Sequence, residues 1–275
     1  MKNTYLVDYH IHTKLCNHAT GEPEEYLKEA QKKNLLEIGF SDHAPLLPDA
    51  TKNIRYSIPF EKITMPLSKI KHYINMIKSL SKKSKIPVKL GLETDFFPST
   101  LSIFQTIKNF DFDYIIGSIH FVDYIGFDQE EFIYETEKYG YGRLIKKYLY
   151  LIRKMAETRL YDIVGHLDIP KKFGKKPGKM FDNDFRKTLN VIRLNRMAVE
   201  INTSGLDRKV KEIYPSLKLI KTCFELNIPV TLGSDAHRPE EVGRHFDEAK
   251  KILKKVGYNK IVLFKDHIQQ IQSIV

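Results

Sequence analysis

The chain has 275 residues, of which 42 % are hydrophobic and 29 % are charged, the composition of an ordinary globular protein. It contains no run of about 18 consecutive apolar residues, so the sequence excludes a membrane-spanning helix. The net charge of +11 at pH 7 is compatible with nucleic acid, a membrane surface or a phosphorylated small molecule as partner. The lysines are spread along predicted helices, often beside glutamates, so we assign most of this charge to solvated helix faces.

The two cysteines, Cys16 and Cys223, are far apart in sequence and do not indicate a disulfide framework. The first residues lead directly into a predicted strand, without an apolar segment or a cleavage site of the secretory type. We therefore expect a cytoplasmic location. Cys16 lies between two histidines, but we interpret it as an inert neighbour, because one thiolate among nitrogen and oxygen donors would be unusual.

The first predicted strand carries two histidines on one face. Residues 5–12 alternate in the period-2 pattern of a strand, so the side chains of His10 and His12 project together. Two imidazoles at this spacing can share one metal ion. His18 follows six residues later, where a loop can return it to a neighbouring ion.

The rest of the chain alternates predicted strands and helices. Strands are expected over 36–40, 87–92, 114–119, 163–165, 198–202, 229–233 and 260–264. Helices are expected over 23–34, 59–81, 130–159, 181–194, 215–226 and 240–256, with a short helix before residue 114 and a final helix after residue 264. Seven or eight such units predict one parallel α/β barrel domain over residues 1–275. A doubly wound open sheet is the alternative, but its glycine-rich phosphate loop is missing.

Histidines and acids follow the predicted strands. The strand ends carry His10, His12, Asp42, His43, Glu93, Asp95, His120, His166, Asp168, Glu200, Asn202, Asp235 and His237. In a parallel barrel these ends meet on one face, where so many imidazoles and carboxylates would be costly without cations. We therefore predict a metal cluster there. His72 and His267, both placed in predicted helices, and His245 are interpreted as structural, because nothing near them completes a ligand set.

Several segments also carry a family resemblance. They are Y-H-I-H-T-K-L-C-N-H, G-F-S-D-H-A-P, G-L-E-T-D-F, I-I-G-S-I-H-F-V-D, V-G-H-L-D, E-I-N-T-S-G-L and T-L-G-S-D-A-H-R-P-E-E-V-G. In this order they resemble the polymerase and histidinol phosphatase (PHP) superfamily, and more narrowly its stand-alone histidinol-phosphate phosphatases. The resemblance covers residues 5–245.

The resemblance implies a distorted, TIM-like (β/α)7 barrel with three divalent metal ions at the C-terminal ends of the strands. Matched by motif, the first ion would be held by His10, His12, Glu93 and Asp235. The second would be held by Glu93, His120 and His166, with the Glu93 carboxylate bridging, and the third by His18, His43 and His237. Such mixed sites suit zinc, manganese or iron better than magnesium, and the sequence leaves the choice among these three open.

This metal site predicts phosphate chemistry. Two ions bridged by Glu93 can hold a hydroxide that attacks phosphorus in line. For binding the substrate, the candidates are Arg208, Lys171, Lys172 and Ser204. Either Asp42 or Asp235 could protonate the leaving alcohol, and the sequence does not choose between them.

We therefore predict a metal-dependent phosphomonoesterase that hydrolyses L-histidinol phosphate in histidine biosynthesis. One alternative is a nuclease or nucleotide phosphoesterase on the same scaffold, and another is a catalytically idle nucleic-acid or metal-binding module. The complete ligand set argues against the idle module. The lack of a polymerase-type region or a focused basic stripe argues against nucleic acid as the partner. The oligomeric state stays open.

Overall fold

Seven parallel strands form the centre of the protein. The structure is a computed structural model that describes residues 6–51, 62–98, 101–123 and 125–274. The strands are β1 (Val7–Ile11), β2 (Glu37–Phe40), β3 (Val88–Asp95), β4 (Tyr114–Ser118), β7 (Ile163–Val164), β8 (Ala198–Asn202) and β9 (Val230–Gly233). Their order in the sheet is their order in the chain, and every neighbouring pair is parallel. The predicted α/β barrel is thereby confirmed.

The seam between β1 and β9 closes the barrel. The amide of His12 donates to the carbonyl of Ala236 (2.9 Å), and the amide of Ala236 donates to the carbonyl of His10 (3.1 Å). The carboxylate of Asp8 accepts the amide of Ser234 at 2.9 Å, although these residues are 226 positions apart. The beginning and the end of the barrel sequence therefore meet at this seam.

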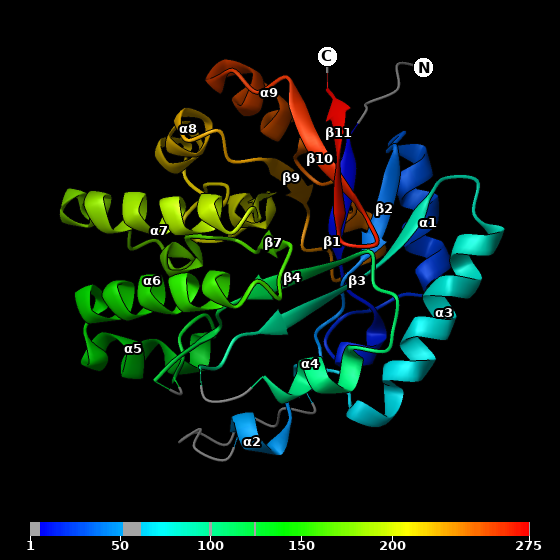
Figure 1. Cartoon of the computed structure of the whole chain (residues 1–275), viewed down its shortest axis with the longest axis horizontal. Helices are drawn as coiled ribbons and strands as arrows, with labels where there is room; N and C mark the ends of the chain where they lie inside the picture. The colour runs from blue at the N-terminus through cyan, green and yellow to red at the C-terminus, as the bar shows by residue number, and fades with distance from the viewer. Residues whose placement is uncertain (1–5, 52–61, 99–100, 124, 275) are drawn as a thin grey trace.

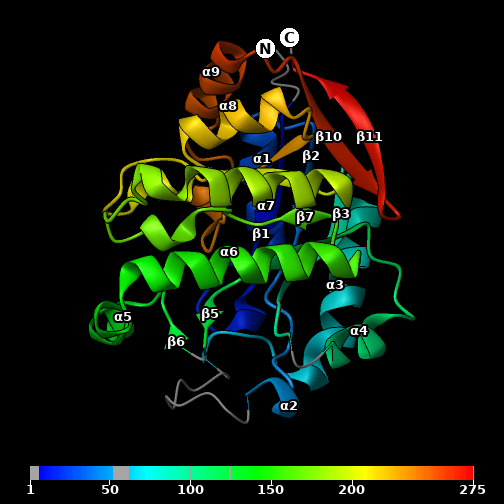
Figure 2. The ribbon, with the colours of Figure 1, turned by 60° about the vertical axis from the view of Figure 1, so that its left-hand side comes forward.

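Helices surround the strands, with α1 and α3 on one side of the barrel and α6 and α7 on the other (Figure 1). They are α1 (Pro23–Lys32), α2 (Pro48–Thr51), α3 (Ile70–Lys83), α4 (Ser102–Ile107), α5 (Ile133–Tyr139), α6 (Tyr141–Thr158), α7 (Asp182–Leu194), α8 (Leu217–Glu225) and α9 (Phe246–Val256). Figure 2 shows α6 and α7 running side by side. Each longer helix buries one apolar stripe, which in α6 includes Leu144, Tyr148 and Ile152.

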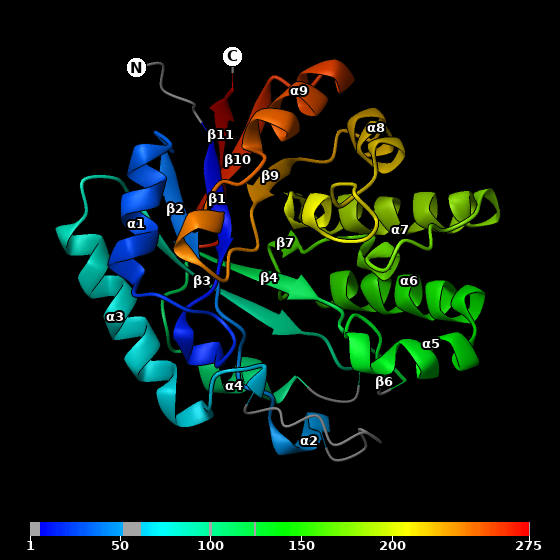
Figure 3. The same cartoon turned by 180° about the vertical axis from the view of Figure 1, so that it is seen from behind.

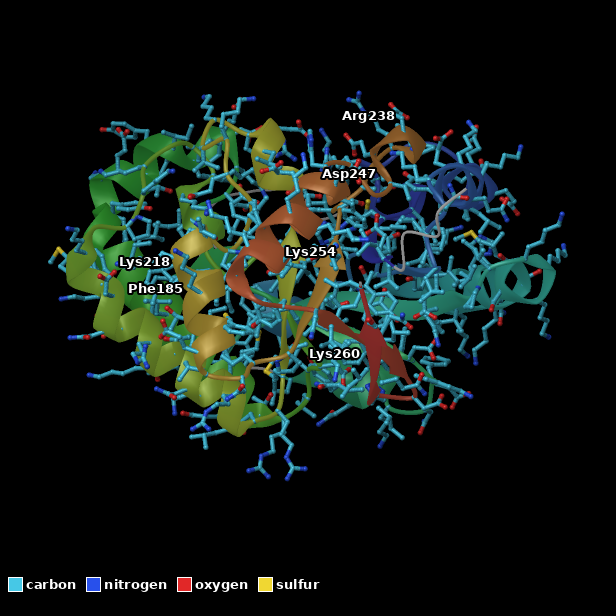
Figure 4. The ribbon with its side chains drawn as sticks, turned by 90° about the horizontal axis from the view of Figure 1, so that it is seen from above. Phe185, Lys218, Arg238, Asp247, Lys254 and Lys260 are labelled. Carbon is cyan, nitrogen blue, oxygen red and sulfur yellow. The ribbon has the colours of Figure 1, made fainter. Side chains whose placement is uncertain are left out.

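The outer faces of the helices carry much of the charge. Figure 4 labels Lys218 on α8 and Asp247 and Lys254 on α9, all on the outside of the molecule. These positions agree with the interpretation of the lysines as solvated helix faces. Among the described residues, no helix combines the length and apolar character that crossing a membrane requires.

Three predicted helices have different bounds. The helix expected over 130–159 is divided into α5 and α6 at Gly140, whose φ of 92° is open to glycine but strained for other residues. The helix expected from residue 240 begins only at Phe246, because His245 has a φ of 57°. In the helix expected over 59–81, residues 59–61 lie outside the described part, and α3 begins at Ile70 after a 3-10 turn.

The predicted C-terminal helix is wrong. The chain instead forms an antiparallel hairpin of β10 (Lys260–Lys265) and β11 (Ile268–Ser273). Asp266 and His267 have φ values of 50° and 64°, as the two central residues of a type I′ hairpin turn require. His267 is therefore a turn residue rather than a helical one. The hairpin lies beside β1 (Figures 1 and 3), where Phe264 contacts the ring of Tyr9.

Candidate active site

All nine residues predicted as metal ligands come together at the C-terminal ends of the strands. His10 and Glu93 lie within β1 and β3, and the others follow β1, β2, β4, β7 and β9. His18 is returned to the cluster by a 3-10 turn over Lys14–Cys16, after which Asn17 has a φ of 69°. The donor atoms of these residues form three neighbouring groups.

The first group surrounds one oxygen of Glu93. Oε2 of this carboxylate lies 3.3 Å from Nε2 of His10 and 3.7 Å from Nε2 of His12. Oδ1 of Asp235 lies 3.9 Å and 3.3 Å from the same two nitrogens. Four donor atoms thus face one point between β1, β3 and the end of β9.

The second group surrounds the other oxygen of Glu93. Oε1 lies 3.1 Å from Nε2 of His166 and 3.8 Å from Nε2 of His120, and these two nitrogens are 3.3 Å apart. The hydroxyl of Ser118 donates to the same oxygen at 2.6 Å. One carboxylate therefore faces two donor groups, as a bridging ligand would.

The third group consists of His18, His43 and His237. Nε2 of His237 lies 2.9 Å from Nε2 of His18, and the ring of His43 is centred 5.2 Å from that of His18. Nδ1 of His43 also lies 2.8 Å from Oε2 of Glu93, so this histidine stands between the third group and the first.

The first group fits a divalent metal ion. In the described part of the chain, Nε2 of His10 and Nε2 of His12 are buried and have no hydrogen-bond partner. Leaving such atoms unpaired costs free energy, and coordination by a metal would satisfy both of them. The mixture of imidazole and carboxylate donors suits zinc, manganese or iron.

Buried carboxylates hold the far side of three of these imidazoles. Nδ1 of His10 lies 2.6 Å from Glu200, and Nδ1 of His120 lies 2.9 Å from Asp95. Asp42 lies 3.5 Å from Nδ1 of His12, an ion-pair distance at which no hydrogen bond forms among the described residues. Such partners fix the ring orientation and leave Nε2 available for a metal. Gly233 is needed here, because a Cβ at this position would overlap the Glu200 carboxylate.

The backbone is strained at two of the nine residues. His166 has a φ of 23° and Asp235 a φ of 54°, values that side-chain-bearing residues rarely adopt. The guanidinium of Arg244 donates to the carbonyls of Ser234 (3.0 Å) and Asp235 (3.1 Å). These bonds support the strained backbone conformation of Asp235. Strain of this kind collects at functional sites, where the surrounding structure maintains it.

The charges in the cluster raise the pKa of some of its histidines and lower the pKa of others. Burial opposes protonation of His10, but Glu200, Glu93 and Asp235 hold its pKa well above the ordinary value. Asp235 and Asp42 likewise outweigh burial and raise the pKa of His12 to about 8, and Asp95 raises that of His120 to about 10. By contrast, burial and the neighbouring histidines lower the pKa of His18 to about 4.

The groups open into a cavity of about 370 Å³. Of the predicted substrate-binding residues, Arg208, Lys172 and Ser204 line this cavity. Lys171 does not: its ammonium group is buried and lies 2.9 Å from both Asp168 and Glu212.

Asp42 also lies outside the cavity lining, because it is buried behind His12 and accepts the hydroxyl of Thr13 and the amide of His43. Asp235, the other predicted acid, lines the cavity.

Three lining residues did not stand out in the sequence. Asp128 follows the short hairpin of β5 (Phe121–Val122) and β6 (Ile125–Gly126), a segment without a periodic pattern. Tyr214 lies in the segment E-I-Y-P-S, ten residues after Ser204. Arg238 directly follows His237 and is labelled at the surface in Figure 4.

The class of protein follows from comparison with known families. Residues 8–204 match the PHP domain family, and residues 220–255 match the PHP-associated family. The chain therefore belongs to the PHP domain family, whose matched region contains seven of the nine clustered residues and ends at Ser204.

Three individual proteins are similar to this chain over most of its length. A Deinococcus radiodurans protein named "Probable histidinol-phosphatase" is 37 % identical over 97 % of this chain and 99 % of its own length. The histidinol-phosphatase of Bacillus subtilis is 28 % identical over 87 % of this chain and 96 % of its own. The crystal structure of histidinol phosphate phosphatase from Lactococcus lactis, complexed with zinc, L-histidinol and phosphate, has a TM-score of 0.76 and is 23 % identical. It covers 97 % of this chain and 99 % of that one, which shows the shared fold.

Proposed function

We propose that this protein is a metal-dependent phosphomonoesterase that hydrolyses L-histidinol phosphate to L-histidinol and phosphate. The observation that carries the proposal is the placement of the three donor groups and the cations of Lys172 and Arg208 around one cavity. The names of the Deinococcus and Bacillus relatives support the choice of substrate. A cavity of about 370 Å³ is of the size that small ligands occupy.

Each donor group would hold one divalent ion, of zinc, manganese or iron, with Glu93 shared by the first two. Bound ions of this kind lower the pKa of water and neutralise charge on a phosphoryl group. The residues of the chain keep the imidazoles of His10 and His120 oriented through Glu200 and Asp95. Of the two predicted acids, only Asp235 lines the cavity, but His10, His12 and His237 outweigh burial and hold its pKa well below the ordinary value, so we assign this ionised carboxylate to the metal and not to protonation of the leaving alcohol.

Arg208 is the residue we assign to the substrate phosphate. Among the described residues, no carboxylate pairs with its guanidinium, whereas the ammonium of Lys172 lies 3.2 Å from Asp128. A guanidinium can clamp two phosphate oxygens at once, which a lysine cannot do.

Replacing Arg208 by alanine should lower kcat/KM for L-histidinol phosphate by roughly tenfold or more, the equivalent of one charged hydrogen bond. Lys209→Ala is the matched control, because Lys209 is the next residue and its ammonium instead faces Glu130, 3.5 Å away. Steady-state kinetics of both variants check this expectation. Equal losses in the two variants would contradict the assignment.

Asp128 is the residue we assign to the cationic amino group of the substrate. Its Oδ1 atom is buried and has no hydrogen-bond partner in the described part of the chain. Although burial opposes it, Lys172 and His120 lower the pKa of Asp128, so this carboxylate is ionised at neutral pH.

Asp128→Asn should therefore reduce kcat/KM for L-histidinol phosphate by about tenfold more than for p-nitrophenyl phosphate, which has no cationic group. The ratio of the two values is the measurement, because a displaced Lys172 would affect both substrates alike. A ratio equal to that of the unmodified protein would exclude this role.

The proposed activity is tested with protein reconstituted with zinc, manganese or iron and offered L-histidinol phosphate, nucleotides and single-stranded DNA. L-Histidinol phosphate should be the best substrate, and its kcat/KM should fall by less than about tenfold between about 50 and 300 mM salt. Preferred cleavage of DNA, with the steep salt dependence of multiple phosphate contacts, would overturn the proposal.

A further inference from the structure

Lys171 is a buried cation beside the active site. It lies at the end of the 3-10 turn Ile169–Lys171 that follows β7, and 1 % of its surface is exposed. A charged lysine is rarely buried to this degree unless all of its donors are paired. Since the side chain does not line the cavity, binding the substrate directly does not account for it.

Three acceptors surround its ammonium group, and all of them connect to one loop. Nζ lies 2.9 Å from Oδ2 of Asp168, 2.9 Å from Oε2 of Glu212 and 2.8 Å from the carbonyl of Ile213. Oδ2 of Asp168 in turn accepts the amide of Ser216 at 2.9 Å. Lys171 and Asp168 thus hold the loop after β8 at residues 212, 213 and 216.

The same loop, residues 203–216, forms one wall of the cavity. It carries Ser204, Arg208 and Tyr214, all of which line the cavity. The ring of Tyr214 lies over the ammonium of Lys171, 5.3 Å from ring centre to Nζ. Gly205 is needed beneath this wall, because a Cβ there would overlap the carbonyl of Glu212 and approach the Tyr214 ring to 2.9 Å.

We propose that Lys171 is a positioning residue that holds the loop 203–216 against the cavity and thereby sets Arg208 and Tyr214 for substrate binding. Only the predicted change in kinetics rests on the proposed function; the predicted change in the loop does not. An Arg208 displaced with the loop weakens phosphate binding in the ground state and the transition state alike, which raises KM more than it lowers kcat.

The test uses the full chain with Lys171→Met, which keeps the length of the side chain and removes its charge. KM for L-histidinol phosphate should rise by roughly tenfold, with kcat changed by less than about threefold. Trypsin should cut the loop after Arg208, Lys209 or Lys211 several times faster than in the unmodified protein. This second readout does not require activity, so it still tests the loop if L-histidinol phosphate proves not to be the substrate.

Lys176→Met is the matched control. Lys176 also contacts Oε2 of Glu212, at 3.3 Å, but its side chain is 55 % exposed. Its replacement should leave both KM and the rate of cleavage unchanged. Equal effects in the two variants, or a folded Lys171→Met protein with unchanged KM and cleavage, would overturn the proposal.

Circular dichroism first establishes whether Lys171→Met folds. If it does not, Glu212→Ala tests the proposal instead. This variant removes one of the three acceptors of the Lys171 ammonium group, and the side chain of Glu212 is partly exposed. A smaller increase of KM together with faster cleavage is expected. No change in either quantity would overturn the proposal.

Discussion

Replacing Glu93 by glutamine will reduce kcat/KM by at least about a hundredfold in a protein that keeps its fold, the scale seen when positioned metal-site groups are lost. The two oxygens of this carboxylate face different donor groups, with Oε2 toward His10 and Oε1 toward His166. Glutamine removes the negative charge between the groups and turns a nitrogen with two hydrogens toward one of them. One substitution therefore weakens the binding of two ions.

Elemental analysis and kinetics on the same preparation check this expectation. Glu37→Gln is the matched control: Glu37 is also a buried strand glutamate, but it accepts the hydroxyl of Tyr9 rather than facing a histidine. It should retain both metal and turnover. Near-normal turnover of a folded Glu93→Gln protein with its full metal content would show that Glu93 is not shared between two ions.

Removing the metal with a chelator will abolish activity, and adding back zinc, manganese or iron will restore it. Elemental analysis of protein purified without chelator should give two to three ions per chain. Activity that persists in chelator, with less than one ion per chain, would contradict the proposed centre.

Metal binding should also release protons. In the metal-free protein the pKa of His12 is about 8 and that of His120 about 10, so both rings are protonated at pH 7. A metal ion binds only the neutral imidazole, and therefore its affinity falls as the pH decreases below these values. Calorimetric titration in two buffers with different ionisation enthalpies measures the release. A binding enthalpy that is independent of the buffer would be the contrary result.

The sequence was sufficient to predict the architecture of the site. In a parallel barrel every strand ends on the same face, so residues as distant as His10 and Asp235 could be placed together from the strand pattern alone. The bounds of the strands agree with the prediction to within a few residues, although the predicted first strand begins at Tyr5, outside the described part.

Neighbouring residues with the same chemistry could not be told apart. Lys171 and Lys172 are equivalent in the sequence, but successive residues of a 3-10 turn point about 120° apart. One ammonium group therefore enters the loop after β8 and the other lines the cavity. The C-terminal hairpin was missed for a related reason, because Ile268, Ile271 and Ile274 repeat at a spacing that also suits a helix.

The seam between β1 and β9 has a consequence for the synthesis of the protein. The ribosome produces His10 and His12 first, whereas Asp235 and His237 emerge only after most of the chain has been made. A nascent chain that ends before β9 can form most of the strands, but it lacks donors of the first and third groups. A full set of bound ions thus marks a completed chain, and the ions would then stabilise the contact that closes the barrel.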